Sequence, residues 1–558
     1  MRNFLFFLLF AFAEVSAGTL PSREELIQRS QKENFDILVI GGGATGTGIA
    51  LDAITRGYSV LLVEQEDFAS QTSSSSTKLL HGGVRYLEKA FTHLDWSQYY
   101  LVKEALHERS TLLKIAPHLT WKIPILLPLY SRLEIPYFWL GMKAYDKLSG
   151  KYSLGPSQYI NRKKTLERFP QVKKKGLKGG IIYWDGQFDD ARLNLAIALT
   201  AISKGAVVLN HMKMLILEKE DGLLTSVVIQ DTLSRENWSV KASIIVNATG
   251  AFVDTIRRLD DPQAPPLLSP SIGSHLVFPP SFAPKNLGML IPKTADGRVL
   301  FLLPWRGVVL AGTTDHPSRV VDNPQPSIDE VNEILLELGN YLEKKPKKED
   351  ILAAWSGLRP LVIQGEKNSS NTSREHVIEH SASGLYSIAG GKWTTYRKMA
   401  EDLVDRLLTD GALPEKGPCV TADTMLYGSK RIFPPGMALG NDISNYLYKT
   451  YGDEALEIET LALNGNDVRL VKGLPYTKAE LIFLLQKKYA FTAEDVLFRR
   501  IRLGFTDHQA TLSALPAVIE LMEKTLSWSP LQSYREYTRV IEKLSTLEPI
   551  KYEIPDSI

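Results

Sequence analysis

The chain has 558 residues, which is long enough for two or three globular domains of ordinary size. Its 65 basic and 63 acidic residues leave a formal charge of only +2, so no charge imbalance indicates a nucleic acid as a partner. Cys419 is the only cysteine, which excludes an internal disulfide, a cysteine-ligated metal site and a dithiol redox pair. We therefore expect no metal site and no nucleic-acid partner, and any redox chemistry needs a bound cofactor.

Residues 1–20 have the features of a targeting signal or an N-terminal anchor. Arg2 precedes an apolar run at residues 4–12, and small residues follow at 15–17. The run is shorter than the roughly 20 apolar residues that a membrane span needs. A secretory signal has these features, whereas a mitochondrial presequence is richer in arginine. The sequence predicts targeting and leaves the destination open.

A glycine-rich turn lies between two apolar stretches, residues 36–40 and 58–63. Gly41, Gly43 and Gly46 have the spacing of a dinucleotide-binding turn. In such a turn the first glycine allows a sharp bend, the second lets the backbone approach a pyrophosphate, and the third lets the helix pack on the strand. We predict a strand, helix and strand unit that binds a dinucleotide. An ordinary glycine turn is the alternative.

Three more residues of this unit are expected to contact the cofactor. Ala44 and Thr45 begin the predicted helix, and the N-terminus of a helix attracts phosphate. Glu64 follows the second strand, where a carboxylate accepts hydrogen bonds from a ribose diol and repels the 2′-phosphate of NADP. The sequence therefore favours a dinucleotide that lacks this phosphate.

Two later apolar strands also end in glycine. Residues 244–250 end at Gly250, and residues 385–391 end at Gly390 and Gly391. In an open α/β sheet, ligands bind beyond the carboxyl ends of the strands. We therefore expect these three glycines to bring backbone to the same cofactor.

The remaining pattern divides the chain into domains. Residues 207–230 alternate and turn at 220–222, as a strand pair does. Residues 256–380 are rich in proline and strands, which favours a mixed-sheet substrate domain. Beyond about residue 420, helical spacing predominates. Helices are predicted at residues 396–408, 478–488, 492–502 and 511–526.

We therefore predict an α/β fold. A Rossmann-like cofactor domain is interleaved with a mixed-sheet substrate domain, and an α-helical domain follows at the C-terminus. Within residues 30–420, the cofactor-binding parts are expected at about 35–115, 180–255 and 381–415 and the substrate-binding parts at about 116–179 and 256–380, and the helical domain at 421–558.

Residues 73–88, Ser-Ser-Ser-Ser-Thr-Lys-Leu-Leu-His-Gly-Gly-Val-Arg-Tyr-Leu-Glu, resemble the signature of FAD-dependent glycerol-3-phosphate dehydrogenases. The resemblance covers about residues 35 to 530, and its further motifs follow in order at residues 273–275, 312–315, 355–360, 390–397 and 495–505. It implies FAD as cofactor and oxidation of sn-glycerol 3-phosphate to dihydroxyacetone phosphate. It also implies that electrons pass to a membrane quinone.

The serine run offers hydroxyls and backbone amides to the FAD pyrophosphate or the flavin edge. On this basis Ser74, Ser75, Thr77 and, by resemblance, Lys78 are predicted to bind the cofactor. A serine run alone is more often a flexible linker. Its place directly after the dinucleotide unit favours the cofactor role.

Oxidation of a phosphorylated alcohol needs a group that holds the phosphate. Arginine suits this task because its planar fork donates two parallel hydrogen bonds. Arg85 and Arg359 are our candidates, and an arginine paired with a surface acid is the alternative. By resemblance, Tyr86 and Thr394 join them in substrate binding. These four residues, with Lys392, form the predicted substrate site.

The predicted catalytic set is His275, His81, Lys392 and Arg359. Histidine suits the proton acceptor because its pKa lies near neutrality. We favour His275 as the base, and His81 then positions the flavin, although one of the two can equally be a core residue. Lys392 follows two glycines that face the flavin, where an ammonium group stabilises negative charge. A lysine at a helix start is its alternative reading.

A peripheral membrane contact is predicted from two kinds of segment. Residues 135–140 combine aromatic and apolar side chains near Lys143 and Lys147, as interfacial segments do, and buried core is the alternative. Lys173 to Lys175 and the arginines at 499, 500 and 502 are candidates for contact with anionic headgroups, although charge runs are usually solvated.

The resemblance implies a peripheral protein of the mitochondrial inner membrane, and the signal-like N-terminus offers a signal-directed membrane compartment as the alternative. Residues 531–558 contain no acidic loop typical of calcium sites, so calcium regulation is not expected. Two other functions stay open: a peroxide-forming flavin oxidase of the same or a related substrate, and a non-catalytic flavoprotein sensor or scaffold. A homodimer is one of the oligomeric states that the sequence allows.

Overall fold

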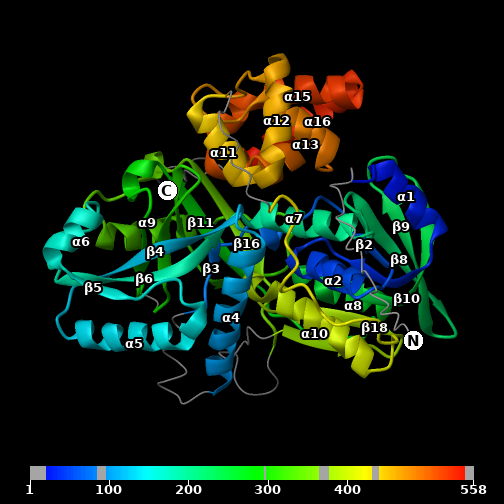
Figure 1. Ribbon diagram of the computed structural model, residues 1–558, viewed down its shortest axis with the longest axis horizontal. Helices are drawn as coiled ribbons and strands as arrows, with labels where there is room; N and C mark the ends of the chain where they lie inside the picture. The colour runs from blue at the N-terminus through cyan, green and yellow to red at the C-terminus, as the bar shows by residue number, and fades with distance from the viewer. Residues whose placement is uncertain (1–19, 84–95, 295–296, 364–375, 430–438, 547–558) are drawn as a thin grey trace, which may run out of the picture.

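The computed structural model describes residues 20–83, 96–294, 297–363, 376–429 and 439–546. Within these ranges the chain forms two sheets side by side and a cluster of helices above their junction (Figure 1). The targeting segment, Arg85 and Tyr86 lie outside the described residues.

The first sheet carries the predicted dinucleotide unit. Among the described residues it has eight strands, and β1 lies between β10 and β2, parallel to both. The chain proceeds from β1 to β2 and β7 on one side and returns through β10 and β18 on the other. The strands are β17 (His376–His380), β18 (Leu385–Gly390), β10 (Asn237–Asn247), β1 (Phe35–Ile40), β2 (Val60–Val63) and β7 (Val207–Leu209), with β8 (Met212–Glu220) and β9 (Leu223–Asp231) paired beyond β10. The reversal of strand order at β1 creates the crevice in which such sheets bind ligands.

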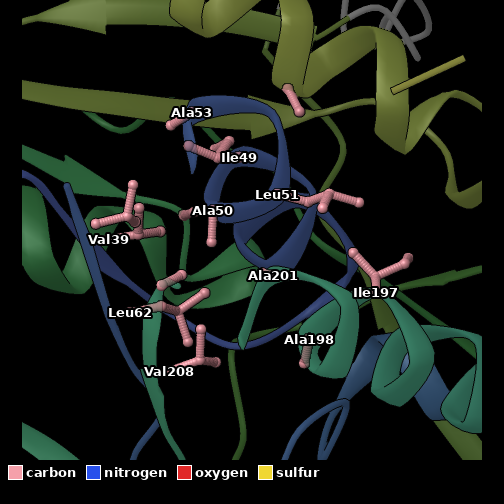
Figure 2. Packing of buried hydrophobic residues seen from close by; sticks show 14 of the residues in the cluster. Val39, Ile49, Ala50, Leu51, Ala53, Leu62, Ile197, Ala198, Ala201 and Val208 are labelled. Atoms are coloured by element: carbon pink, nitrogen blue, oxygen red, sulfur yellow. The ribbon is translucent and has the colours of Figure 1, made fainter. Parts of the chain in front are cut away.

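Five helices of the described ranges pack against this sheet or against one another beside it. They are α1 (Arg23–Lys32), α2 (Ala44–Thr55), α7 (Asp190–Ser203), α8 (Val253–Asp260) and α10 (Tyr396–Thr409). Figure 2 shows α2 between the strand residues Val39 and Leu62 and the α7 residue Ile197. Ala50 and Ala53 of α2 are small enough for this close packing. Each large apolar side chain buried here contributes about 1.5–3 kcal/mol to folding, so this core holds the glycine turn in place.

The strand pair predicted at residues 207–230 is confirmed as the antiparallel hairpin of β8 and β9. Its second strand pairs with the first half of β10, which is therefore longer than the predicted strand at 244–250. The hairpin extends the first sheet and brings residues 212–215 to its ligand-binding edge.

The second sheet is mixed, as predicted, and has ten strands in the part of the chain that the structure describes. In order, they are β15 (His316–Pro317), β11 (Ser271–Phe278), β14 (Val308–Gly312), β13 (Leu300–Trp305), β12 (Gly288–Ile291), β4 (Thr120–Leu129), β6 (Gly179–Phe188) and β3 (Leu79–Leu80), with β16 (Ala353–Arg359) beside β11 and β5 (Gln158–Asn161) beside β6. Helices α4 (Trp96–Ile115), α5 (Glu134–Ser149), α6 (Arg162–Arg168) and α9 (Ile328–Tyr341) accompany it.

The C-terminal domain is helical, as predicted. It comprises α11 (Asn441–Tyr451), α12 (Ala455–Leu461), α13 (Lys478–Lys487), α14 (Leu503–Thr506), α15 (His508–Leu526) and α16 (Pro530–Ser545). The helix predicted at residues 492–502 is present but shorter: residues 493–500 are helical, with a π-helical turn at Asp495–Arg500. Arg502, with φ +65°, is left-handed and lies beyond the end of this helix.

Two segments differ from the predicted domain boundaries. Strand β6, which the sequence assigned to the cofactor part from residue 180, pairs with β4, β5 and β3 of the second sheet. Residues 421–429, assigned to the helical domain, contact the first domain instead: Leu426 is buried in its core and its N–H donates to the carbonyl of Ile115. Local composition carries no signal for either long-range contact.

Among the helices in the described ranges, none combines the length and the apolar character needed to cross a membrane.

Candidate active site

A cavity of about 790 Å³ lies beyond the carboxyl ends of β1, β2, β10 and β18. Six of the residues that line it were predicted from the glycine turn, from glycine-ended strands or from the acid after β2: Gly41, Gly43, Glu64, Gly250, Gly390 and Gly391. Because its walls come from segments far apart in the chain, the cavity depends on the strand order of the first sheet. Its place is that predicted for the cofactor.

The glycine turn is shaped by contacts that exclude a side chain. Gly41 has φ +110°, and a Cβ there would lie 2.7 Å from the carbonyl oxygen of Ala248. A Cβ at Gly46 would lie only 1.9 Å from the carbonyl oxygen of Gly41. The turn therefore packs backbone on backbone, which brings the N-terminus of α2 to the cavity wall.

The N-terminus of α2 is suited to a phosphate. Gly43 at the N-cap has no side chain to cap the helix, and the first turn contains no acid. Ala44 and Thr45 line the cavity, and the Ala44 N–H donates to the Ser73 hydroxyl at 3.0 Å. The positive end of the helix dipole thus faces the cavity, which favours an anionic ligand there.

Asn194 of α7 supports the turn from behind, a role that the sequence gave no reason to expect. Its Nδ2 donates to the carbonyl of Gly42 at 2.8 Å, and its Oδ1 accepts from the Thr47 hydroxyl at 2.9 Å. Asn194 and Thr47 are fully buried. Because the two partners are about 150 positions apart in the sequence, only the fold reveals the contact.

Glu64 lies in the cavity wall at the end of β2. Its carboxylate accepts from the Gly42 N–H at 2.7 Å and from the Glu66 N–H at 3.0 Å. Burial raises the pKa of Glu64 to about 7, although both of these backbone hydrogen bonds oppose the shift. Glu64 therefore lines the cavity at the end of β2, where the sequence predicts a diol-binding acid.

The third wall follows β18. Gly390, Gly391 and Lys392 line the cavity, and a Cβ at Gly391 would lie 2.3 Å from the sulfur of Met399. The next turn buries Thr394, while the indole of Trp393 donates to the carbonyl of Ser73 at 2.9 Å. Lys392 therefore reaches the cavity from a segment tied to the serine run, whereas Thr394 lies behind the wall.

His275 is buried in β11 beneath the serine run. Its ring stacks on Trp355 at 4.2 Å, and a hydrogen bond of 3.0 Å joins its Nε2 to the Thr77 hydroxyl. Burial, followed by the charges of Lys78 and Arg359, lowers the pKa of His275 well below its usual value. The imidazole is therefore neutral at physiological pH, as a proton acceptor needs to be.

Arg359 ends β16 near this histidine. Its guanidinium donates to the Asp315 carboxylate at 2.8 Å, to the Thr313 hydroxyl at 2.8 Å and to the Thr314 carbonyl at 2.9 Å. Pro360, the next residue, lines the cavity. Arg359 thus lies close to the cavity with its fork held in a fixed orientation.

His81 follows β3 and is partly exposed, with its ring 6.2 Å from that of Phe301. The predicted phosphate ligand Arg85 and its neighbour Tyr86 come next in the chain but lie outside the described residues. Gly82, between these positions and β3, donates its N–H to the Tyr145 hydroxyl at 3.0 Å.

Comparison with known proteins agrees with this geometry. Residues 36–397 match the family described as FAD dependent oxidoreductase, and residues 387–533 match the C-terminal domain of alpha-glycerophosphate oxidase. The chain is 47% identical over 548 residues to the mitochondrial glycerol-3-phosphate dehydrogenase of Rattus norvegicus, which covers 94% of this chain and 75% of that protein. The chain belongs to the FAD-dependent glycerol-3-phosphate dehydrogenase family.

Two further relatives of this dehydrogenase chain span most of its length. It is 43% identical over 547 residues to the probable mitochondrial glycerol-3-phosphate dehydrogenase of Dictyostelium discoideum, covering 93% of this chain and 86% of that protein. A solved structure of the glycerol-3-phosphate dehydrogenase from Bacillus halodurans, complexed with FAD, matches with a TM-score of 0.77 and 30% identity. That match covers 95% of this chain and 99% of the other, so the predicted fold class is confirmed.

The serine run of the dehydrogenase differs in detail from its prediction. Ser73 lines the cavity, whereas Ser74, Ser75, Thr77 and Lys78 do not. Lys78 is completely buried and donates to the Asp190 carboxylate and the Ser74 carbonyl, both at 2.6 Å. Direct contact of these four residues with the cofactor stays a prediction.

The arginines of the C-terminal domain are not a membrane surface, so that prediction is wrong. Arg499 and Arg500 are buried and pair with Asp67, at 2.8 and 2.6 Å. Arg502 is also buried and pairs with Asp190 at 2.9 Å. The sequence could not distinguish these arginines from a solvated basic run, because Asp67 and Asp190, which pair with them, are several hundred positions away.

Proposed function

We propose that this chain oxidises sn-glycerol 3-phosphate to dihydroxyacetone phosphate with FAD bound in the cavity beyond β1. One observation carries the proposal: the open N-terminus of α2 and the Glu64 carboxylate face the same cavity. They supply a phosphate site and a diol site on one wall, which are the two features that an ADP moiety needs. The family of the chain supports FAD as the dinucleotide.

The chain's own residues fit this cofactor. Gly41 and Gly43 leave room where a pyrophosphate approaches backbone, and Glu64 takes the ribose hydroxyls. Gly250, Gly390 and the residues after them form the remaining walls. Bound FAD accepts the hydride from the alcohol carbon.

The substrate is proposed to bind near Arg359 and Lys392. The guanidinium fork carries a charge that attracts a phosphate, which would replace the hydrogen bonds that Arg359 donates to the Thr313 hydroxyl and the Thr314 carbonyl. The ion pair of Arg359 with Asp315 at 2.8 Å keeps that fork in one orientation. We retain Arg85, Tyr86 and Thr394 as further substrate-binding candidates by resemblance.

His275 is proposed to accept the hydroxyl proton. Its lowered pKa keeps the ring neutral, so that it can accept a proton. Its hydrogen bond to the Thr77 hydroxyl fixes the orientation of the ring. His81 is the second candidate, because it lies at the partly exposed end of β3.

Electrons are proposed to leave for a membrane quinone through a peripheral contact at α5. Leu133, Tyr137 and Leu140 are 86%, 50% and 68% exposed, while Ile135, Phe138 and Trp139 of the same segment pack against the hydrophobic core. Lys143 and Lys147 lie on the same helix. An apolar and aromatic surface beside lysines suits the headgroup boundary of an anionic membrane.

The proposed location is the inner mitochondrial membrane. Its support is the word mitochondrial in the names of the rat and Dictyostelium relatives. The three-part division into cofactor, substrate and helical domains is likewise proposed, with β6 moved to the substrate part and residues 421–429 to the cofactor part.

Anaerobic mixing of the purified holoenzyme with glycerol 3-phosphate tests the activity. We expect the oxidised flavin band to bleach with glycerol 3-phosphate and not with glycerol, and to return when a quinone analogue is added. Return mainly with oxygen and release of peroxide would favour the oxidase. A flavin that glycerol 3-phosphate does not bleach would overturn the substrate assignment and favour the sensor.

A further inference from the structure

The segment between the diol-binding acid and β3, residues 65–78, is here called the cofactor loop. Its first part supplies much of the cavity wall, namely Gln65, Glu66, Ala69, Ser70, Gln71, Thr72 and Ser73. A loop of this length needs fixed points if its backbone is to keep one geometry. Trp393 and His275 hold this loop through hydrogen bonds to Ser73 and Thr77, and two further fixed points come from the C-terminal domain.

The first fixed point is Asp67. Its carboxylate, fully buried, accepts from Arg500 at 2.6 and 2.9 Å and from Arg499 at 2.8 Å. Asn210 adds a hydrogen bond at 2.9 Å. The two hydrogen bonds from Arg500 use both nitrogens of its fork, which fixes direction as well as distance.

The second fixed point is the carbonyl of Ser74. It accepts from Arg502 at 2.9 Å and from Lys78 at 2.6 Å. The same nitrogen of Arg502 also donates to Asp190 at 2.9 Å, whose other oxygen accepts from the Ser76 hydroxyl at 2.7 Å. One C-terminal arginine therefore holds the far end of the cofactor loop both directly and through Asp190.

The backbone at Arg502 points to the same role. Its φ of +65° lies in the left-handed region, which glycine adopts without strain and residues with a side chain rarely adopt. Arg502 is nevertheless 0% exposed and makes directed contacts with the loop. Apolar residues could join two domains without desolvating charges, so buried arginines at this interface indicate that orientation matters.

We propose that Arg500 and Arg502 are positioning residues of the FAD site, and that through them the C-terminal domain holds the cofactor loop in its FAD-binding geometry. This inference rests on the proposed function, because FAD is the ligand of the cavity. It makes the helical domain above the sheets in Figure 1 a part of the cofactor site.

Titration of the apoprotein with FAD tests the proposal independently of turnover. Arg500→Met and Arg502→Met are each expected to raise the Kd for FAD by about 10- to 100-fold, the range for loss of a charge-assisted hydrogen bond. Arg535→Met, a matched change at an exposed arginine of α16, is expected to leave the Kd unchanged. A lowered melting temperature with an unchanged Kd for FAD would mean a merely structural role and would overturn the proposal.

Arg502→Gly guards against a variant that fails to fold. Glycine relaxes the left-handed backbone while it removes the contact with Ser74, so we expect a folded protein with the same weakened FAD binding. Arg502→Lys keeps one charge without the fork and is expected to recover part of the affinity. A Kd equal to that of the wild type in the glycine variant contradicts the proposal.

Hydrogen exchange of the wild-type protein supplies a second measurement. FAD binding is expected to protect residues 65–78 and 495–506 together, and to leave α16 unchanged. Protection of the loop alone would overturn the inference while leaving FAD binding intact. A wild-type apoprotein that takes up no FAD would instead overturn the proposed function itself.

Discussion

The guanidinium of Arg359 and the carboxylate of Asp315 form an ion pair of 2.8 Å between the end of β16 and the loop after β14. A Cβ at Gly273 on the neighbouring strand would lie 2.3 Å from the same guanidinium. Asp315 thus orients the guanidinium of Arg359, and the missing side chain at Gly273 leaves the space that the guanidinium occupies. Its fork is oriented before any substrate arrives.

Arg359→Lys tests this preorganised fork. Lysine keeps the charge but cannot donate two parallel hydrogen bonds, so we expect kcat/KM for glycerol 3-phosphate to fall by about 10- to 100-fold. FAD content should stay at the wild-type level. Arg319→Lys, at an exposed position of the same domain, is the control. Equal kcat/KM in the two variants would remove Arg359 from the substrate site.

Glu64→Gln tests the diol site through the pH dependence of FAD binding. The pKa of Glu64 is raised to about 7 in the FAD-free protein, so its acceptor form is lost as the pH falls through that value. We expect FAD affinity of the wild type to fall between about pH 8 and about pH 6. The Gln variant should bind about 10-fold more weakly and lose this pH dependence. A pH dependence that survives in the variant would assign it to another group.

The same shift has a consequence for stability. A carboxyl group with a raised folded-state pKa holds a proton that the unfolded chain releases near pH 4.5. Its contribution to the free energy of unfolding is therefore complete below that pH and is lost as the pH rises through about 7. Unfolding curves of FAD-free wild type and Glu64→Gln should converge at low pH.

Gly46→Ala tests the packing of the glycine turn. The new methyl group would lie 1.9 Å from the Gly41 carbonyl, so the helix has to move away from β1. We expect a loss of about 1–3 kcal/mol of stability, as overpacked cores show, together with lost FAD binding. Gly141→Ala is the matched control, because no atom lies within 4 Å of its Cβ and it sits inside α5. That variant should gain up to about 1 kcal/mol, and both values follow from chemical denaturation.

His275→Gln tests the proton acceptor. We expect kcat to fall by about 10²- to 10⁴-fold, and more than in His81→Gln. Because the ring is buried, and because the charges of Lys78 and Arg359 act in the same direction, the pKa of His275 lies well below 6.5. The wild-type pH profile of kcat/KM should therefore keep its value well into the acid range. A larger loss in His81→Gln would reverse the two assignments.

Protonation of His275 also changes the free energy of unfolding. Its depressed folded-state pKa means that the unfolded chain takes up this proton first as the pH falls below about 6.5. The contribution of the neutral ring is therefore complete above that pH and decreases below it, which acid unfolding of the wild type and His275→Gln can separate.

Leu140→Glu tests the proposed membrane contact. A carboxylate on the exposed face of α5 should weaken binding to anionic vesicles and leave activity with a water-soluble acceptor unchanged. Leu336→Glu on α9 replaces a leucine of similar exposure, 65%, and is the control. Equal vesicle binding by both variants would place the contact elsewhere.

Local sequence signals predicted much of the cofactor site. The glycine spacing and Glu64 were sufficient because a strand, a turn and a helix are set by neighbours in the chain. The serine run was predicted to contact the cofactor, and Ser73 of that run lines the cavity. Asn194 was missed because its role arises from contacts with Gly42 and Thr47, about 150 positions away in the chain. The buried arginines at 499, 500 and 502 were misread for the same reason. Their local sequence is that of a solvated basic run, and it does not show that Asp67 and Asp190 pair with them in the fold.

The strand order of the first sheet also sets when FAD can bind during synthesis. The cavity wall begins at Ile40 and is complete only with Met399, because β18 pairs with the earlier strand β10 and α10 follows β18 in the chain. A nascent chain of about 400 residues therefore still lacks the arginines that hold the cofactor loop. Chains are synthesised at about 5–20 residues per second, so the residues that complete the cavity wall are made tens of seconds after the glycine turn. Cofactor loading is thus a late event in the maturation of this enzyme.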